Sequence, residues 1–312
     1  MRTVKISAGL VCAALVWVGL LSLMAGGGGQ SVSVPSTDGS QASIKFIDKA
    51  KFYVDQSGEV SVRMDILGAD KKPILGLSPQ KFRVTEKGIE VPVKALNGPG
   101  TQPINVMLVI DISGSMRQGN RIDAARDAAL VAVDALQVDR DRLGLIVFDD
   151  RFDVLQPLSD LTSNAKENCR QSIQRLQPRG GTTIGPPTVE ALRLFEQAAP
   201  NGIKLLLVMT DGEDPDLHSH IERIAKASDA QGVPVYTIAF GDKNAGAERV
   251  LKDMAAKCQG EYYFAPSGDE LARIYRSRVE EASNEFLIVY DSPYPEADGL
   301  PRRVQIEVEA YH

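Results

Sequence analysis

The sequence is poor in the residues on which several functional classes depend. Its 312 residues include three cysteines, three histidines and one tryptophan. Three cysteines cannot build a disulfide scaffold, and so few histidines leave little material for histidine-based catalysis. The single tryptophan, Trp17, lies in an N-terminal apolar run. The rest of the chain therefore offers no tryptophan platform for stacking on a sugar.

Positive charge is also in deficit. The chain has 35 Lys and Arg against 41 Asp and Glu, a formal net charge of −6. Binding to nucleic acid depends on clustered Lys and Arg that displace counterions from phosphates, so we expect no nucleic-acid partner. Apolar residues at 43% and charged residues at 24% are typical of a globular protein, which excludes wholesale disorder. The sequence contains no phosphate-loop motif and no Gly-x-Ser-x-Gly motif, so neither a P-loop nucleotide site nor a serine hydrolase has local support.

The N-terminus has the pattern of a targeting segment. Arg2 and Lys5 precede an apolar run over residues 6–25, and this asymmetry predicts that the following chain crosses the membrane. The run is long enough to span a bilayer of about 30 Å, but small residues from Ala25 onward also resemble a cleavage site. Residues 1–27 are therefore expected to be a retained membrane anchor or a cleaved signal peptide. In both cases the remainder is expected to be extracytoplasmic.

Both flanks of the chain show strand periodicity. Residues 28–43 are rich in Gly and Ser and are predicted to be a flexible linker. Within residues 44–98, apolar side chains alternate with polar ones, and the same alternation returns in residues 285–312. Examples are Val60, Val62, Met64 and Ile66, and then Val304, Ile306 and Val308. Such alternation indicates antiparallel strands with one wet face. We expect the two flanks to form one small antiparallel β-sandwich into which the middle of the chain is inserted.

Residues 101–284 have a different pattern. Near-continuous apolar runs occur at Ile104–Ile110, Leu143–Phe148, Ile203–Met209 and Val233–Phe240. Runs of this kind are typical of parallel strands buried on both faces. Helical periodicity lies between most of them, so the pattern predicts a doubly wound α/β domain. Val154–Leu158 is expected to be an edge strand in a hairpin with the second run, and Ser267 to open the last helix through a capping box.

Oxygen-bearing side chains follow two of these predicted strands. Asp111, Ser113 and Ser115 come after the first strand, and alternate residues of an extended segment face the same way. Asp211 follows the strand that begins at Ile203, and a Gly-Gly-Thr-Thr loop beginning at Gly180 presents a hydroxyl. Doubly wound sheets bind ligands at the carboxyl ends of their strands where the strand order reverses. If the strands before Asp111 and Asp211 flank that reversal, these groups converge.

A site of two carboxylates and three hydroxyls indicates a particular metal chemistry. All the donors are hard oxygens, which favour Mg²⁺, Mn²⁺ or Ca²⁺ over Zn²⁺. Mg²⁺ takes about six oxygen ligands, so five groups leave room for an oxygen from elsewhere. An external carboxylate is the natural further ligand. The site therefore predicts metal-bridged capture of an exposed Asp or Glu on a protein partner.

The combination of Asp-x-Ser-x-Ser after a strand, a later Gly-Gly-Thr and a later Thr-Asp-Gly resembles the von Willebrand factor type A domain. Its metal-ion-dependent adhesion site uses that set, and the resemblance assigns Thr182 rather than Thr183 to it. The resemblance covers about residues 103–284 and implies a mostly parallel six-stranded sheet with one antiparallel edge. It also implies a divalent cation bound by the five matching residues, Asp111, Ser113, Ser115, Thr182 and Asp211. The flanking strands are similar to bacterial proteins that place this domain within a small β-domain.

Three functional hypotheses follow. The leading one is a non-enzymatic, metal-dependent adhesion or interaction module exposed outside the cytoplasmic membrane. The second is a scaffold for assembly of an envelope complex, in which an ATPase could be a partner. The third, a metal-assisted hydrolase, needs a positioned base, and only the acidic loop after Asp211 supplies carboxylates for that role. We therefore expect no enzymatic activity.

Several other polar groups are interpreted more simply. Glu213, Asp214 and Asp216 are expected to form a solvated acidic rim, with a role in partner selection as the alternative. His218 and His220 are expected to be surface residues rather than a metal pair. Cys169 and Cys258 are predicted to be buried thiols rather than a disulfide.

Overall fold

The chain divides into two compact units. The computed structural model describes residues 3–7, 31–35, 41–45, 52–54, 59–67, 77–198, 202–294 and 304–309. One unit comprises Met1–Thr101 together with Asn284–His312, and the other is the continuous segment Gln102–Ser283.

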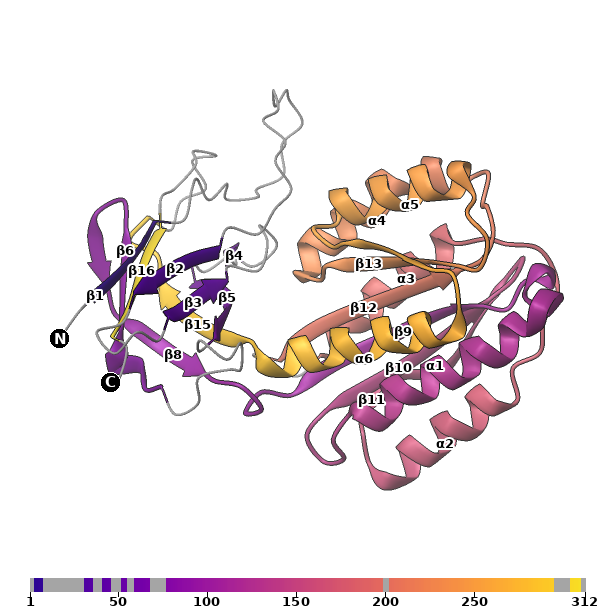
Figure 1. Ribbon diagram of the computed structural model, residues 1–312, viewed down its shortest axis with the longest axis horizontal. Coiled ribbons are helices and arrows are strands. Elements are labelled where there is room, and N and C mark those ends of the chain that lie inside the picture. Colours follow the sequence, from indigo (N-terminus) through magenta and orange to yellow (C-terminus); the bar gives the residue numbers. More distant parts are fainter. Residues whose placement is uncertain are drawn as a thin grey trace. The chain divides into compact units, whose positions relative to one another are not determined.

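The larger unit contains a six-stranded sheet (Figure 1). Its strands, in spatial order, are β11 (Phe152–Asp160), β10 (Arg142–Phe148), β9 (Ile104–Asp111), β12 (Ile203–Thr210), β13 (Val235–Phe240) and β14 (Tyr262–Ala265). Neighbouring strands are parallel except for the antiparallel pair of β10 and the edge strand β11. The predicted doubly wound, mostly parallel sheet with one antiparallel edge is confirmed.

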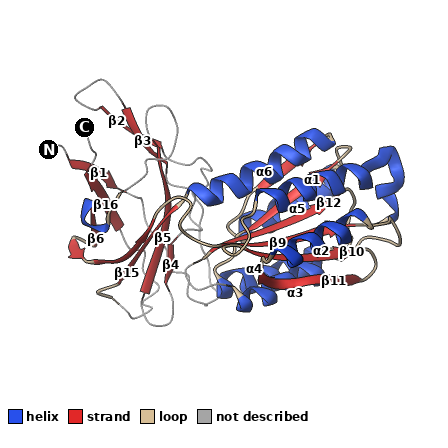
Figure 2. Ribbon diagram, turned by 90° about the horizontal axis from the view of Figure 1, so that it is seen from below, coloured by secondary structure: helices blue, strands red, loops and turns tan. Residues whose placement is uncertain are grey.

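Helices cover both faces of this sheet (Figure 2). One face carries α1 (Arg121–Ala135), α2 (Ser163–Gln174) and α6 (Gly268–Asn284). The other carries α3 (Gly185–Leu194), α4 (Leu217–Gln231) and α5 (Ala245–Lys257). One half of the predicted capping box is present at the start of α6, where the Ser267 hydroxyl accepts a hydrogen bond from the backbone N–H of Glu270 at 3.3 Å. Both carboxylate oxygens of Glu270 accept from Arg273.

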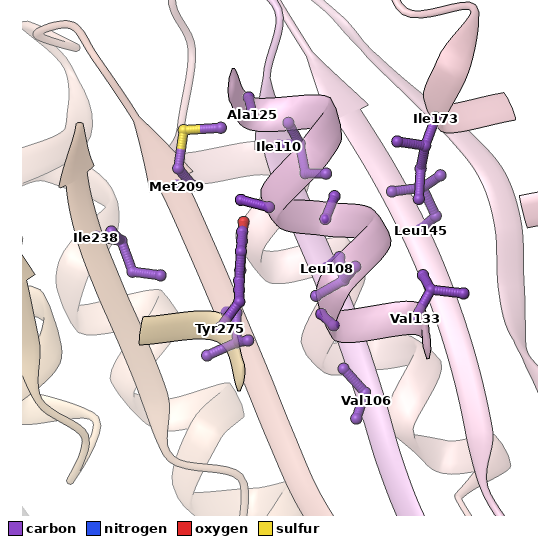
Figure 3. Close-up of a cluster of buried hydrophobic side chains, with 14 of the residues drawn as sticks. Val106, Leu108, Ile110, Ala125, Val133, Leu145, Ile173, Met209, Ile238 and Tyr275 are labelled. Atoms are coloured by element: carbon purple, nitrogen blue, oxygen red, sulfur yellow. The ribbon is translucent and has the colours of Figure 1, made fainter. Parts of the chain in front are cut away.

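The burial of strand β9 explains why its sequence is a nearly continuous apolar run. All eight of its residues are buried. Val106, Leu108 and Ile110 pack into the core beneath α1, where Tyr275 of α6 also inserts (Figure 3). The alternate residues, such as Met107 and Val109, belong to the core on the opposite face. A strand buried on both faces carries apolar side chains at nearly every position. The exceptions in β9 are Asn105, whose side-chain amide donates to the Ile203 carbonyl at 3.2 Å, and Asp111 at its end.

The strand order reverses between β9 and β12. From β9 the chain proceeds outward to β10 and β11, and then returns to place β12 on the other side of β9. The carboxyl ends of β9 and β12 are Asp111 and Thr210. Doubly wound sheets form their ligand sites at such a reversal, so this edge of the sheet is where a functional site is expected.

The smaller unit is built from antiparallel sheets. One sheet has the order β1 (Thr3–Ser7), β16 (Val304–Glu309), β6 (Phe82–Glu86) and β7 (Ile89–Val91). The other has the order β2 (Ser31–Pro35), β3 (Gln41–Lys45), β5 (Glu59–Leu67), β15 (Phe286–Asp291) and β8 (Val93–Asn97), and β4 (Phe52–Val54) also pairs with β5. One buried cluster draws on both sheets, with Val62 and Ile288 from one and Val84 and Ile306 from the other.

The N-terminal region differs from its predicted organisation. Within the predicted flexible linker, residues 28–43, β2 and the start of β3 form an antiparallel pair. The reason is that Ser31–Pro35 alternates Ser and Val with the period of a strand, a signal that the neighbouring glycines obscured. Thr3–Ser7, within the predicted anchor or signal peptide, pairs as β1 with β16. Residues 8–27 of that prediction lie outside the described residues, and none of the described helices is both long and apolar enough to cross a bilayer.

Candidate metal site

Asp111 ends β9 with its carboxylate fully buried. One oxygen, Oδ1, accepts a hydrogen bond of 2.6 Å from the backbone N–H of Ser113, and Oδ2 accepts one of 2.5 Å from the Thr210 hydroxyl. Burial raises the pKa of Asp111 to about 6, and the charge of Asp211 acts in the same direction, while these hydrogen bonds oppose the rise. A cation at this position would compensate the cost of the buried charge.

Three more of the predicted residues continue this network. The Oγ atoms of Ser113 and Ser115 lie 3.0 Å apart. The Ser115 hydroxyl donates to Oδ1 of Asp211 at 2.6 Å, and the Asp211 side chain has no exposed surface. Residues 96 positions apart in the sequence are thus joined directly. The cluster is compact and its oxygens are already oriented by one another.

Thr182 reaches the same place from the loop before α3. The backbone N–H of Gly114 donates to the carbonyl of Gly180 at 3.0 Å, which ties this loop to the segment after β9. A Cβ atom at Gly212, the residue after Asp211, would lie 3.1 Å from the Thr182 hydroxyl oxygen. All five predicted site residues therefore lie at the edge where β9 and β12 end. Their role as metal ligands stays a prediction.

The turn between β10 and β11 holds the Thr182 loop in position. Oδ1 of Asp150 accepts a hydrogen bond of 2.9 Å from the Gly181 N–H, and the carbonyl of Asp149 accepts one of 2.9 Å from the Thr183 N–H. Gly180 has φ of +65°, and a Cβ atom there would lie 2.7 Å from the Asp150 carboxylate. The loop therefore requires glycine at this position. In the sequence, Asp149 and Asp150 are marked only by their place between the two strands of the predicted hairpin.

Thr210 is a site residue that sequence reasoning missed. Its hydroxyl donates to Asp111, as described above, and accepts a hydrogen bond of 3.1 Å from the backbone N–H of Gly212. It thus links the two strand ends on either side of the reversal. Thr210 belongs to the Thr-Asp-Gly motif, but only the Asp of that motif was assigned to the predicted site.

Replacing Thr210 by valine should weaken the site without changing its shape. In Thr210→Val the buried Asp111 oxygen loses its donor, which should cost about 1–3 kcal/mol of unfolding free energy and weaken Mg²⁺ binding. Thr210→Ser keeps the hydroxyl and is the matched control. Urea unfolding and calorimetric Mg²⁺ titration measure the two effects. Equal behaviour of the valine and serine variants would contradict this role.

Arg121 is the second site residue that was missed. Its Nη1 atom lies 2.9 Å from Oδ2 of Asp211, and its Nη2 atom lies 2.6 Å from Oδ2 of Asp242. Nothing in the local sequence pattern around Arg121 indicates the distant carboxylates that it reaches. A fixed positive charge therefore lies beside the candidate metal site.

The acidic loop after Asp211 is more than a solvated rim. Asp214 is 9% exposed, and its Oδ2 accepts hydrogen bonds from the backbone N–H groups of Ile184 at 2.7 Å and Gly185 at 3.4 Å. It therefore caps the N-terminus of α3. Glu213 and Asp216 are exposed, as expected.

The histidine pair after Asp216 and the two described cysteines form no metal cluster in the described part of the chain. His218 is exposed, and the ring of His220 packs beside Gly185 of α3. Cys169 and Cys258 are buried and free, which confirms the prediction of buried thiols. In the part of the chain that the structure describes, no three or more His, Cys, Asp and Glu side chains gather as a metal cluster. A cation at the β9–β12 edge would depend on the hydroxyl oxygens as well as the carboxylates.

The donor set fits a hard divalent cation. Hydrogen bonds of 3.0 and 2.6 Å link Ser113 to Ser115 and Ser115 to Asp211, and Asp111 accepts one from the backbone of Ser113. Every side-chain atom of this set that could ligate a cation is an oxygen. Such oxygens suit Mg²⁺, Mn²⁺ or Ca²⁺.

Comparison with known proteins identifies the family. The family model of the von Willebrand factor type A domain matches residues 105–277, which are more than half of the chain. The chain belongs to this family. A protein of Synechocystis sp. described as uncharacterized is 32% identical over 204 residues, which are 63% of this chain and 46% of that protein. The chain thus spans less than half the length of this curated relative.

Two solved structures show the same fold. The von Willebrand factor type A protein from Catenulispora acidiphila has a TM-score of 0.52 at 16% identity, and the likeness covers 93% of this chain and 68% of that one. Proximal thread matrix protein 1 of the mussel byssus has a TM-score of 0.51 at 21% identity, over 62% of this chain and 48% of that one. In that structure the metal-ion-dependent adhesion site holds zinc.

Proposed function

We propose that this chain is a non-enzymatic module that binds a protein partner through a divalent cation. The proposed ligands are Asp111, Ser113, Ser115, Thr182 and Asp211. The observation that carries the proposal is their convergence, from three separate loops, on the edge where the strand order reverses. The zinc-bearing adhesion site of the mussel protein supports a divalent cation at this position of the fold.

The residues divide the work of such a site between charge and geometry. Asp111 and Asp211 carry two negative charges in a buried setting, which together match the charge of one divalent cation. The three hydroxyls add neutral oxygens, so the cation stays electrophilic and offers a Lewis-acid position to an outside carboxylate oxygen. Mg²⁺ is the proposed cation, with Mn²⁺ or Ca²⁺ as alternatives, because the set contains no nitrogen or sulfur donor.

The partner is proposed to be a protein that presents an exposed Asp or Glu outside the cytoplasmic membrane. The charge asymmetry around the N-terminal apolar run supports that location, and the same run would join the chain to the membrane if it is retained. A hydrolase would need a positioned base near the cation. The acidic loop supplies none among its buried groups, because Asp214 is committed to the α3 N-terminus.

Affinity capture from the native envelope tests this function. The full chain should retain the same polypeptides in Mg²⁺ and lose them in excess EDTA. Asp111→Asn should lose them in both buffers, whereas Asp123→Asn, an exposed carboxylate on α1, should behave as wild type. Retention of the same polypeptides in EDTA would contradict the proposal. Capture of one stoichiometric complex would favour the assembly scaffold over a general adhesion module.

A further inference from the structure

The guanidinium of Arg121 occupies the side of Asp211 that faces away from the serine hydroxyls. We propose that Arg121 is a built-in counter-charge that sets, by lowering it, the affinity of the adjoining site for its divalent cation. This inference rests on the proposed metal site and adds to it a residue outside the five ligands.

The contacts of Arg121 are those of a fixed charge rather than a surface side chain. Its side chain is 14% exposed, and the Asp211 side chain that it contacts is fully buried. Oδ1 of Asp211 accepts from Ser115 at 2.6 Å while Oδ2 is bound by Nη1 of Arg121 at 2.9 Å. The same carboxylate is therefore shared between the candidate metal site and the guanidinium.

Helix preference does not explain an arginine at this position. Arg121 is the first residue of α1, where the helix dipole disfavours a cation. The preceding residue, Asn120, has φ of +58° and makes no capping hydrogen bond with its side chain. The ion pairs with Asp211 and Asp242 are what hold the basic side chain here.

The loop after β13 is shaped around this side chain. Gly241 has φ of +92°, and a Cβ atom there would lie 2.7 Å from Nε of Arg121. Any other residue would therefore be strained by its backbone, and its Cβ atom would displace the guanidinium. The close approach brings Asp242 to the second Nη atom. The loop after β13 thus leaves room for the Arg121 side chain beside the carboxyl ends of β12 and β13.

The signs of the neighbouring charges determine whether Arg121 raises or lowers the affinity for the cation. Asp111 and Asp211 attract a divalent cation with two buried negative charges, and Arg121 offsets one of them. Asp242 also contacts this guanidinium, but its side chain is 95% exposed, so Asp242 offsets only part of the Arg121 charge. In the cation-free protein Arg121 relieves the repulsion between the buried carboxylates. When the cation binds, the like charge of Arg121 opposes it.

Calorimetric Mg²⁺ titration of full-chain variants tests the proposal. Arg121→Gln should lower the dissociation constant for Mg²⁺ on the order of tenfold, which is the effect of one charge beside a partly buried site. The same variant should unfold at a lower temperature in EDTA. Arg121→Lys keeps the positive charge but presents one ammonium where the guanidinium contacts two carboxylates, so its Mg²⁺ affinity should lie between those of wild type and Arg121→Gln. Arg117→Gln is the matched control, because Arg117 lies before α1 in the same segment and donates to the Pro178 carbonyl at 2.9 Å instead of a carboxylate.

A folded Arg121→Gln protein that binds Mg²⁺ as weakly as wild type, or more weakly, would overturn the proposal. If that variant does not fold, Asp242→Asn provides the second test. It frees the guanidinium to act on Asp211 alone and should weaken Mg²⁺ binding more than Glu213→Gln, which removes an exposed carboxylate from the loop after β12. Equal effects of these two variants would then overturn it. If the inference about Arg121 fails but capture of the partner still depends on the metal, the proposed function stands. If the wild-type chain binds no divalent cation, both the inference and the proposed function fail.

Discussion

Asp111→Asn should abolish stabilisation by Mg²⁺ and, in chelator at pH 8, make the protein more stable than wild type. The Asp111 pKa is raised by burial from 3.8 to about 6. A carboxyl group whose folded pKa lies above its unfolded value favours folding at low pH, and that contribution is lost as pH rises through the folded pKa. At pH 8 the cation-free wild type therefore carries the cost of this buried charge, which is at most about 3 kcal/mol. Asparagine removes the charge and can still bond to Ser113 and Thr210.

Unfolding experiments at pH 4, 6 and 8, each in EDTA and in Mg²⁺, measure this prediction. The gain of Asp111→Asn over wild type in EDTA should be small at pH 4 and largest at pH 8. Asp123→Asn, the exposed control, breaks a surface ion pair with Arg126, so it should stay within about 1 kcal/mol of wild type and keep its stabilisation by Mg²⁺. A substituted protein that is still stabilised by Mg²⁺, or that is less stable than wild type in EDTA at pH 8, would contradict the role assigned to Asp111.

Leu108→Ala should reduce the free energy of unfolding by about 3–4 kcal/mol. Leu108 lies in the middle of β9, is fully buried, and packs beneath α1 in the core of the larger unit (Figure 3). Truncation removes buried methyl groups and leaves a cavity that neighbours on several elements cannot all close. Leu155→Ala on the edge strand β11 is the control, because Leu155 is 40% exposed. It should cost about 0.5 kcal/mol or less.

Urea unfolding of the two leucine variants decides the matter. A cost below about 1 kcal/mol for Leu108→Ala, or equal costs for both variants, would mean that β9 is not the central strand of a tightly packed sheet. Since β9 also carries Asp111 at its end, the same result would remove the rigid support on which the site geometry depends.

The strands that the sequence predicts well are those with a strong local pattern. Strands β9, β10, β12 and β13 are buried on both faces, so their apolar runs stand out. The sixth strand, β14, has four residues, three of them only partly buried, and it was expected only from the family resemblance. Strand β2 was missed because its short Ser-Val alternation follows a glycine run and also fits a linker. Strand β3 begins in the predicted linker and ends in the region predicted to form strands.

The candidate site was predictable to the extent that its residues are marked by their own motifs. Asp111, Ser113 and Ser115 follow one strand, and Asp211 follows its neighbour, so the topology brings them together. The contributions of Thr210, Arg121 and Asp150 depend on which distant groups they reach. Such contacts are properties of the folded chain. The Thr-Asp-Gly motif marks Thr210, but no spacing in the sequence indicates the contacts of Arg121 and Asp150.

The most direct test of the central claim is anomalous diffraction from crystals of the full chain grown with Mn²⁺. The proposal predicts one strong anomalous peak within ligation distance of the hydroxyl oxygens of Ser113, Ser115 and Thr182, between the carboxylates of Asp111 and Asp211. It also predicts that no peak occurs there in crystals of Asp111→Asn. Absence of the wild-type peak, or its appearance at another place on the molecule, would contradict the claim that these five side chains bind one cation.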